Sequence, residues 1–131
     1  MYQLHPGTNH VRWQTGHLVG SAYAVLRILG ENLQGPEDTE KLFGGGSALK
    51  SDPSVYPAQT DLREQLYKLW DRIYNRLDKV DESLMDETVD FSEEWQPTRF
   101  EALMLLAAHN FYHAGQAVQT MRSLGKDRPF G

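Results

Sequence analysis

AAHNFYHAGQAV, residues 107–118, places His109 and His113 four residues apart in a stretch without any charged side chain. In a helix, residues four apart stand one above the other on the same face, so the two imidazoles would point into the same space. A buried imidazole needs a partner, and two adjacent rings can share one. The stretch therefore predicts a helix of the protein core and makes a shared metal ion a candidate partner.

The histidine pair lies within a longer helical pattern, which we predict at about 98–124. Thr98-x-x-Glu101, directly after a proline, is a capping box and marks the start of a helix. Arg122 suits the last turn and Gly125 the position just past the end. No charged residue occurs between Glu101 and Arg122. Because a helix that is apolar nearly all round must be covered on most sides, we expect it in the middle of the protein.

Two further helices are predicted at about 9–29 and 58–80. In the first, Asn9 is suited to the N-cap and Gly30 to the position after the C-terminus. In the second, apolar residues recur at spacings of three and four and form one core face: Leu62, Leu66, Leu69, Ile73, Leu77 and Val80. No strand pattern competes with these three long helices, so the predicted fold class is all-α, with a single domain over 1–131.

The segment 31–59 is long for a connection and contains three consecutive glycines, Gly44–Gly46. It has two interpretations. Either it is a flexible linker, or it folds over the mouth of a pocket and is anchored there by Phe43. A connection of this length in a compact domain is often functional, so both interpretations stay open.

The composition excludes several classes of function. The chain has 131 residues, a net charge of −5 and no cysteine. Disulfides, cysteine-based zinc sites and a thiolate nucleophile of its own are therefore excluded, and a reducing cytoplasm fits. Acidic residues predominate without any basic cluster, which argues against nucleic acid as a partner. No signal peptide is visible, and the polar residues within 102–121 favour a buried helix over a membrane span.

On a helical wheel, four polar side chains of the 98–124 helix form one narrow strip, namely His109, His113, Gln116 and Thr120. Two imidazoles four residues apart can bind one cation with little reorganisation, although this spacing also arises by chance. His17 lies on the apolar face of the 9–29 helix and supplies a third ligand, and three histidines leave coordination positions open, as in catalytic sites. Gln116 either orients a ligand or makes an ordinary hydrogen bond.

The remaining polar residues near these motifs are weaker candidates. Asn110 follows His109, so the His-Glu-x-x-His motif of zinc proteases is missing together with its general base. His5 is most simply a surface residue. His10 lies seven residues before His17, which makes it a candidate for the rim of a pocket.

Three stretches of the chain resemble the DinB-like superfamily. HNFYHAGQAVQTMRSLG (109–125) is similar to the family's last helix, with its His-x-x-Tyr-His-x-Gly-Gln pattern followed by Arg-x-x-Gly. PGTNHVRWQTGHL (6–18) resembles the family's Asn-His-x-x-Trp-x-x-Gly-His-Leu signature. LFGGGS (42–47), with a Tyr-Pro before the next helix, is similar to its long connection. The three stretches occur in the family's order and span nearly the whole chain.

The resemblance implies a DinB-like four-helix bundle that binds a divalent metal ion, whether zinc, nickel or iron, through His17, His109 and His113. It also implies a pocket or a set of ligand-supporting residues that includes Gln116, Asn9, Trp13 and Tyr112. Relatives include S-transferases and isomerases that use mycothiol, bacillithiol or glutathione, and a domain of an iron-dependent enzyme of the ergothioneine pathway. The family's first helix should precede residue 6 by some tens of residues, so we expect an N-terminally truncated domain.

The leading hypothesis is a bacterial, cytoplasmic, metal-dependent thiol S-transferase whose partners are a small-molecule thiol and an electrophile. The metal would lower the pKa of the thiol and present it as a thiolate. Two alternatives are a metal-binding bundle without turnover and a degenerate fold whose histidines are structural. We further expect an apolar groove along one side of the bundle, covered by a preceding segment or by a second copy in a homodimer.

Overall fold

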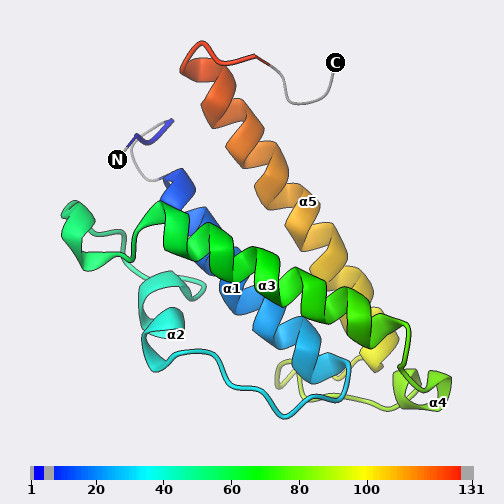
Figure 1. Ribbon diagram of the computed structural model, residues 1–131. Helices are drawn as coiled ribbons and strands as arrows, with labels where there is room; N and C mark the ends of the chain where they lie inside the picture. Colours follow the sequence, from blue (N-terminus) through cyan, green and yellow to red (C-terminus); the bar gives the residue numbers. More distant parts are fainter. Residues whose placement is uncertain (1, 5–7, 128–131) are drawn as a thin grey trace.

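Three long helices form the frame of the structure: α1 (Val11–Ile28), α3 (Gln59–Leu77) and α5 (Arg99–Ser123). The computed structural model describes residues 2–4 and 8–127 (Figure 1). Three short helices lie in the connections: α2 (Glu37–Phe43), η1 (Pro53–Val55) and α4 (Glu82–Met85). Across the described ranges no β-strand forms, only an isolated bridge between Thr88 and Thr98. The all-α class and the three predicted long helices are confirmed.

α1 is the central helix, because it packs against α2, α3 and α5 (Figure 1). Ten of its 18 residues are buried, compared with four of the 25 residues of α5. The prediction that the 98–124 helix lies in the middle of the protein is therefore wrong. An apolar helix is buried only where a neighbouring element covers it, and α1 has such neighbours on more sides than α5.

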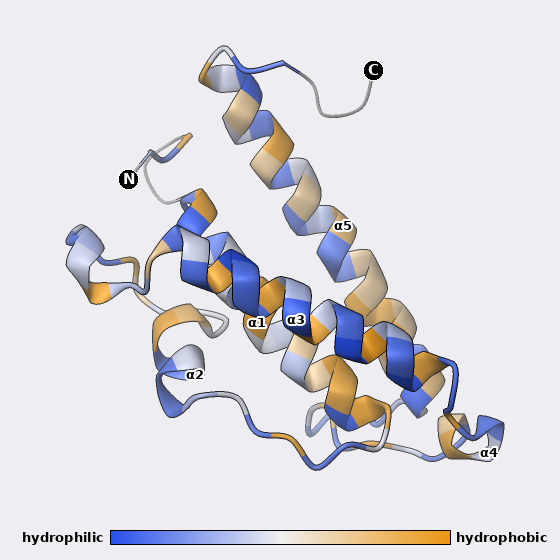
Figure 2. Ribbon diagram, in the orientation of Figure 1, coloured by the Kyte–Doolittle hydropathy of each residue, from blue (hydrophilic) through white to orange (hydrophobic). Residues whose placement is uncertain are grey.

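The main core lies where the apolar side chains of α1 meet those of α3 and α5. Leu69 and Ile73 of α3 and Ala102 and Leu106 of α5 pack into the same cluster as the buried residues of α1. α3 is amphipathic, and hydrophobic residues (orange) alternate along it with hydrophilic ones (blue) in Figure 2. Leu62, Leu69 and Ile73 are buried as their spacing predicted, whereas Leu77 at the end of α3 is exposed.

The two ends of α1 are fixed by different devices. His10, and not the predicted Asn9, is the N-cap, since its Nδ1 accepts a hydrogen bond from the backbone N–H of Trp13 at 3.0 Å. An unprotonated ring nitrogen does here what an asparagine oxygen does in an ordinary cap. At the other end Gly30 has φ +87°, the left-handed conformation expected just past a helix.

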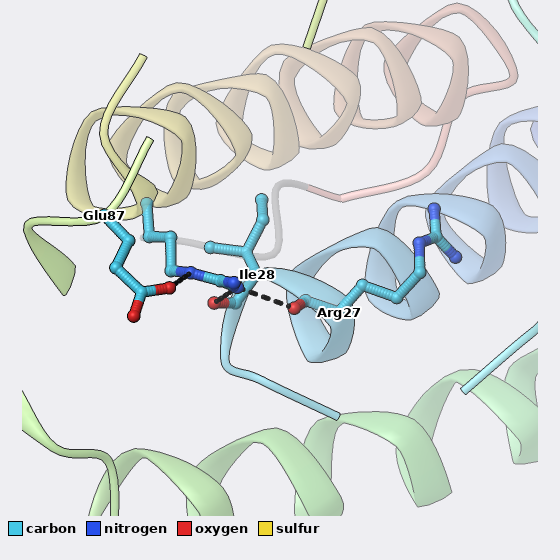
Figure 3. Close-up of polar contacts among 4 residues, drawn as sticks. Arg27, Ile28 and Glu87 are labelled. Atoms are coloured by element: carbon cyan, nitrogen blue, oxygen red, sulfur yellow. Dashed lines mark hydrogen bonds and ion pairs between the residues drawn. The ribbon is translucent and has the colours of Figure 1, made fainter. Parts of the chain in front are cut away.

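Arg99 ties the start of α5 to the end of α1 (Figure 3). Its guanidinium donates hydrogen bonds to the carbonyl oxygens of Arg27 and Ile28 at 3.1 and 2.9 Å, and it lies 3.3 Å from a carboxylate oxygen of Glu87. A cation at this position binds carbonyl oxygens at the helix end, of which that of Arg27 also accepts from the backbone N–H of Gly30, and complements the helix dipole. α5 starts where α1 ends, so the helices run antiparallel (Figure 1). The predicted capping box of α5 is also present.

The connection between α1 and α3 folds back onto α1, which supports the interpretation of an anchored loop. Its helix α2 ends at Phe43, whose ring is buried in a cluster with Trp13, Tyr56 and Leu62. The ring lies against Gly16 of α1, where any Cβ atom would overlap it. A second anchor follows the glycines, because the indole N–H of Trp13 donates to the Ser47 hydroxyl at 2.9 Å.

The face of α5 that points away from α1 is exposed and apolar. Its large exposed side chains include Phe100, Met104 and Phe111. The sequence predicted an apolar groove along one side of the bundle, and the described residues show exposed apolar side chains on this face of α5. Among the helices described here, none is both long and apolar enough to cross a membrane.

Candidate metal centre

Three histidines from two helices converge between α1 and α5. Nε2 of His109 lies 3.1 Å from Nε2 of His17 and 3.0 Å from Nε2 of His113. The ligand atoms of all three residues lie within 4.8 Å of one another. Imidazole nitrogens about 2.0–2.1 Å from one zinc ion lie about 3.0–3.4 Å from each other. Two of the three separations already have this value, so a small movement of the rings would complete a metal site.

Two of the rings have their tautomers fixed by the chain. Nδ1–H of His17 donates to the backbone carbonyl oxygen of Phe43 at 2.6 Å. Nδ1–H of His113 donates to the side-chain oxygen of Gln116 at 3.0 Å. In both neutral rings the proton is therefore on Nδ1, and Nε2 offers a lone pair to the shared space. Hydrogen bonds of this kind orient metal-binding histidines.

The ring of His109 cannot satisfy its own polar atoms in the metal-free protein. Its Nδ1 is buried and has no hydrogen-bond partner among the described residues. A proton on Nδ1 leaves a buried donor unpaired and three Nε2 lone pairs facing one another. A proton on Nε2 satisfies one neighbour and leaves Nδ1 without a donor. A shared cation removes the conflict among the Nε2 atoms, so the donor set fits a divalent metal.

The electrostatics keep two of these rings in the neutral form that binds metal. Burial, together with the neighbouring His109 and His17, lowers the pKa of His113 to about 4. Burial also lowers the pKa of His109, with a second contribution from His17. At neutral pH a metal ion would therefore displace no proton from His113.

The sequence model of the DinB superfamily matches residues 2–117. The match includes all three histidines and covers most of the described helices. The chain belongs to the DinB superfamily. The resemblance that rests on the three sequence stretches is thereby confirmed. Among curated proteins and solved structures, none matches the chain.

The other four residues that the resemblance to the DinB superfamily implied differ in how closely they approach the histidines. Trp13 is buried and stacks on His17, with 4.8 Å between ring centres and 11° between planes. Gln116 holds His113, which favours the orienting role over an unrelated hydrogen bond. Tyr112 is exposed, with its ring edge against His113. Asn9 is further away, and only its backbone oxygen has a described contact, accepting from Gln14.

His10 of this DinB protein lies away from the cluster. His10 is buried as the cap of α1 and packs edge-on against Tyr56, so its predicted place at a pocket rim is wrong. Its Nδ1 atom caps the N-terminus of α1, and the position of a residue on a helical wheel does not reveal such a role. His5 lies outside the described residues.

A cavity of about 810 Å³ opens beside the histidines, between α1, α2 and α5. His17 and His109 line it, as do Phe43 and Gly44 at the end of α2. The cavity continues along α1 past the small residues Gly20, Ser21 and Ala24. A molecule bound in this cavity would therefore reach the shared space between the imidazoles.

Sequence reasoning missed the backbone carbonyl of Phe43 as a contributor to the site. The residue was considered only as an anchor of the loop. A carbonyl has no signature in a sequence, since every residue carries one. The signal that could have found it is the combination of Gly16, one residue before His17, with a lone aromatic residue before three glycines.

The metal-free protein is expected to lose stability as the pH falls from 6.5, the ordinary histidine pKa, to about 4, the pKa of His113. Burial lowers the pKa of His10 as well. Because these pKa values are lower in the folded state, the unfolded chain binds protons first in this window, and the free energy of unfolding falls by on the order of 2 kcal/mol. Urea unfolding in the presence of a chelator measures the effect.

His10→Asn is the informative variant for this pH dependence. Asparagine is a good N-cap and does not titrate, so the variant should keep the helix start and lose less stability on acidification. A free energy of unfolding that stays constant across the window in the wild-type chain would contradict the prediction.

Proposed function

We propose that this DinB protein is a divalent-metal-dependent enzyme that activates a small-molecule thiol for transfer to an electrophile. The observation that supports this best is the convergence of three Nε2 atoms, two of them in a fixed tautomer, beside an open cavity. His17, His109 and His113 would hold the metal ion, which would supply a lowered pKa to a thiol bound beside it, so that the thiol would be present as a thiolate.

The chain's own residues would prepare the site in three ways. Oxygen atoms of Phe43 and Gln116 accept hydrogen bonds from Nδ1–H of His17 and His113, which leaves Nε2 of both rings free for the metal. Trp13 covers one face of the His17 ring and keeps water from it. The connection between α1 and α3 contains α2 and is called the α2 loop. It is anchored by the buried Phe43 ring and fixes the wall of the cavity next to the histidines. Such support limits the reorganisation needed when metal and thiol bind.

The shape and lining of the cavity favour turnover over a purely structural metal. A volume of about 810 Å³ falls in the range of small-molecule sites, which is about 300–1,000 Å³. Apolar side chains of α5 and of the preceding connection form one wall, namely Leu105, Leu106 and Phe91. A closed structural site has no need of such a space beside its ligands.

Cobalt substitution tests the proposal directly, because the chain contains no cysteine. Protein purified without a histidine tag is loaded with Co²⁺, its metal content is measured by mass spectrometry, and glutathione, bacillithiol or mycothiol is added. We expect one metal ion per chain and a sulfur-to-cobalt charge-transfer band that can come only from the added thiol. Thiol consumption with a panel of electrophiles then measures turnover.

Gly20→Leu is the matched control for the cavity. A Cβ at Gly20 meets only the Thr39 methyl group, at 3.4 Å, so a longer side chain can extend into the cavity and leave the three histidines in place. The variant should bind cobalt like the wild type and show a weaker thiol band. Well under one metal per chain would mean that the histidines are structural. Bound cobalt without a thiol band or thiol-dependent turnover would mean a non-catalytic metal-binding bundle.

A further inference from the structure

The outer face of α5 has an apolar pattern that neither the fold nor the candidate metal site uses. We call it the outer stripe, and it consists of Phe100, Met104, Ala107, Phe111, Ala114, Val118 and Met121. Its spacings alternate between four and three residues along the whole helix, the repeat by which one helix packs lengthwise against another. His109 and His113 lie on the opposite side of α5, toward α1.

The outer stripe exposes an apolar patch as large as the largest patch of a typical monomer. Phe100, Met104 and Phe111 are 56%, 54% and 79% exposed. With about 200 Å² for a fully exposed side chain of this size, these three alone leave roughly 380 Å² open. The largest apolar patch of a monomer, typically about 300–600 Å², is often functional.

Small residues flank the most exposed aromatic ring of the stripe. Phe111 lies between Ala107 and Ala108 on one side and Ala114 and Gly115 on the other. Gly115 is in the interior of the helix, where glycine costs about 1 kcal/mol relative to alanine. A Cβ added there would meet nothing within 4 Å, so the described part of the chain gives no reason for a glycine. A second protein chain packed closely against Gly115 would give a reason for the glycine.

We propose that the outer stripe pairs with the same stripe of a second copy, antiparallel, about a two-fold axis at Phe111. Residues equally distant from Phe111 then face each other along the two helices. Met104 meets Val118 of the partner subunit, and Ala107 meets Gly115 of the partner subunit. The small residues beside each Phe111 leave a hollow for the ring of the other copy.

Charge complementarity favours this antiparallel pairing over a parallel one. No charged residue lies between Glu101 and Arg122, so the whole stripe can be covered without burying a charge. Antiparallel pairing places Arg122 near Glu101 of the partner subunit at both ends of the interface. Parallel pairing would place like charges beside each other, which is unfavourable.

The size of the stripe predicts a weak dimer. With the small residues included, two copies would bury about 1,000 Å², near the lower limit for a specific interface. We therefore expect a dimer that dissociates on dilution. Because the histidines face the other way, dimer formation should leave metal binding unchanged, and this proposal does not depend on the proposed function.

Sedimentation velocity of the full chain over a range of concentrations tests the proposal. The wild type should pass from monomer to dimer, and Phe111→Glu should remain monomeric at every concentration. Gly115→Gln should weaken the dimer at least about tenfold while matching or exceeding the melting temperature of the wild type, since glutamine is the better helix former. Gln119→Glu adds the same charge to the exposed flank of α5 and should still dimerise.

Introduced cysteines in this cysteine-free chain report the direction of pairing. A mixture of Met104→Cys and Val118→Cys chains should form a disulfide-linked pair on oxidation. Neither variant alone should form one. In the antiparallel pair, the two copies of residue 104 are offset by fourteen residues along the helices, which is about 21 Å, and the same holds for residue 118. A wild type that stays monomeric at high concentration would overturn the proposal and leave the stripe to another occupant. A Phe111→Glu dimer, or cross-linking of Met104→Cys alone, would overturn it equally.

Discussion

His109→Ala is expected to lower the affinity for a divalent metal by at least about 100-fold, because it removes the ligand in the centre of the cluster. Nε2 of His109 is the atom that lies 3.1 and 3.0 Å from the other two. His113→Ala should have an effect of the same size. Both variants should remain folded, since alanine is the better helix former. Competition with a chromophoric chelator measures affinity, and circular dichroism measures helix content.

A histidine outside the cluster is the control for this experiment. His10 is buried on α1 and holds the helix start without approaching the site, so His10→Asn should bind metal like the wild type. If His109→Ala and His113→Ala both retain one equivalent of tightly bound metal, the ion is held elsewhere. If both variants unfold, the rings are needed for packing, and the metal-binding interpretation loses its main support.

Gly16→Ala should destabilise the fold and the site together. A Cβ at this position overlaps the buried ring of Phe43, so the ring and its backbone must move. We expect the free energy of unfolding to fall by about 2–3 kcal/mol, even though alanine gains about 1 kcal/mol of helix propensity. Because the Phe43 carbonyl orients His17, metal affinity should fall as well. Urea unfolding and the chelator assay measure the two effects separately.

Gly20→Ala is the matched control, one turn further along the same helix. A Cβ at Gly20 makes only an ordinary van der Waals contact with Thr39, so the variant should be at least as stable as the wild type. Equal stability changes in the two alanine variants would show that Phe43 yields easily and that the α2 loop is not firmly anchored. Loss of stability in Gly16→Ala with unchanged metal affinity would show that the Phe43 carbonyl is not needed by His17.

The histidine cluster could be predicted from the sequence because most of it is local. The i, i+4 spacing of His109 and His113 fixes their common direction once a helix forms. Predicting His17 as the third ligand required more information, namely its place on the apolar face of α1 and the family signature around it. The contact between His17 and Phe43 could not be predicted, because it joins a side chain to a backbone carbonyl in an irregular segment.

The placement of the helices was predicted less well than their bounds. Periodicity and capping residues are local signals, and they located all three long helices to within three residues. Burial depends on which neighbours the chain supplies, and the hydrophobicity of α5 does not reveal that one of its faces is left open. The cap of α1 shows the same limit, since His10 and Asn9 are both plausible from sequence and only the hydrogen bond to Trp13 distinguishes them.

The distance along the chain between the ligands has a consequence for folding. His109 and His113 come together as soon as one helix forms, whereas His17 lies 92 residues from His109 and joins them only when α1 docks on α5. A metal ion bound by all three is then a cross-link in a chain without disulfides. Because the ion leaves when the chain unfolds, it stabilises the folded state by mass action, by about 2.7 kcal/mol at a free metal concentration 100 times the dissociation constant. Unlike a disulfide, this link would be opened by a chelator, so chelation should speed unfolding and the metal should slow it.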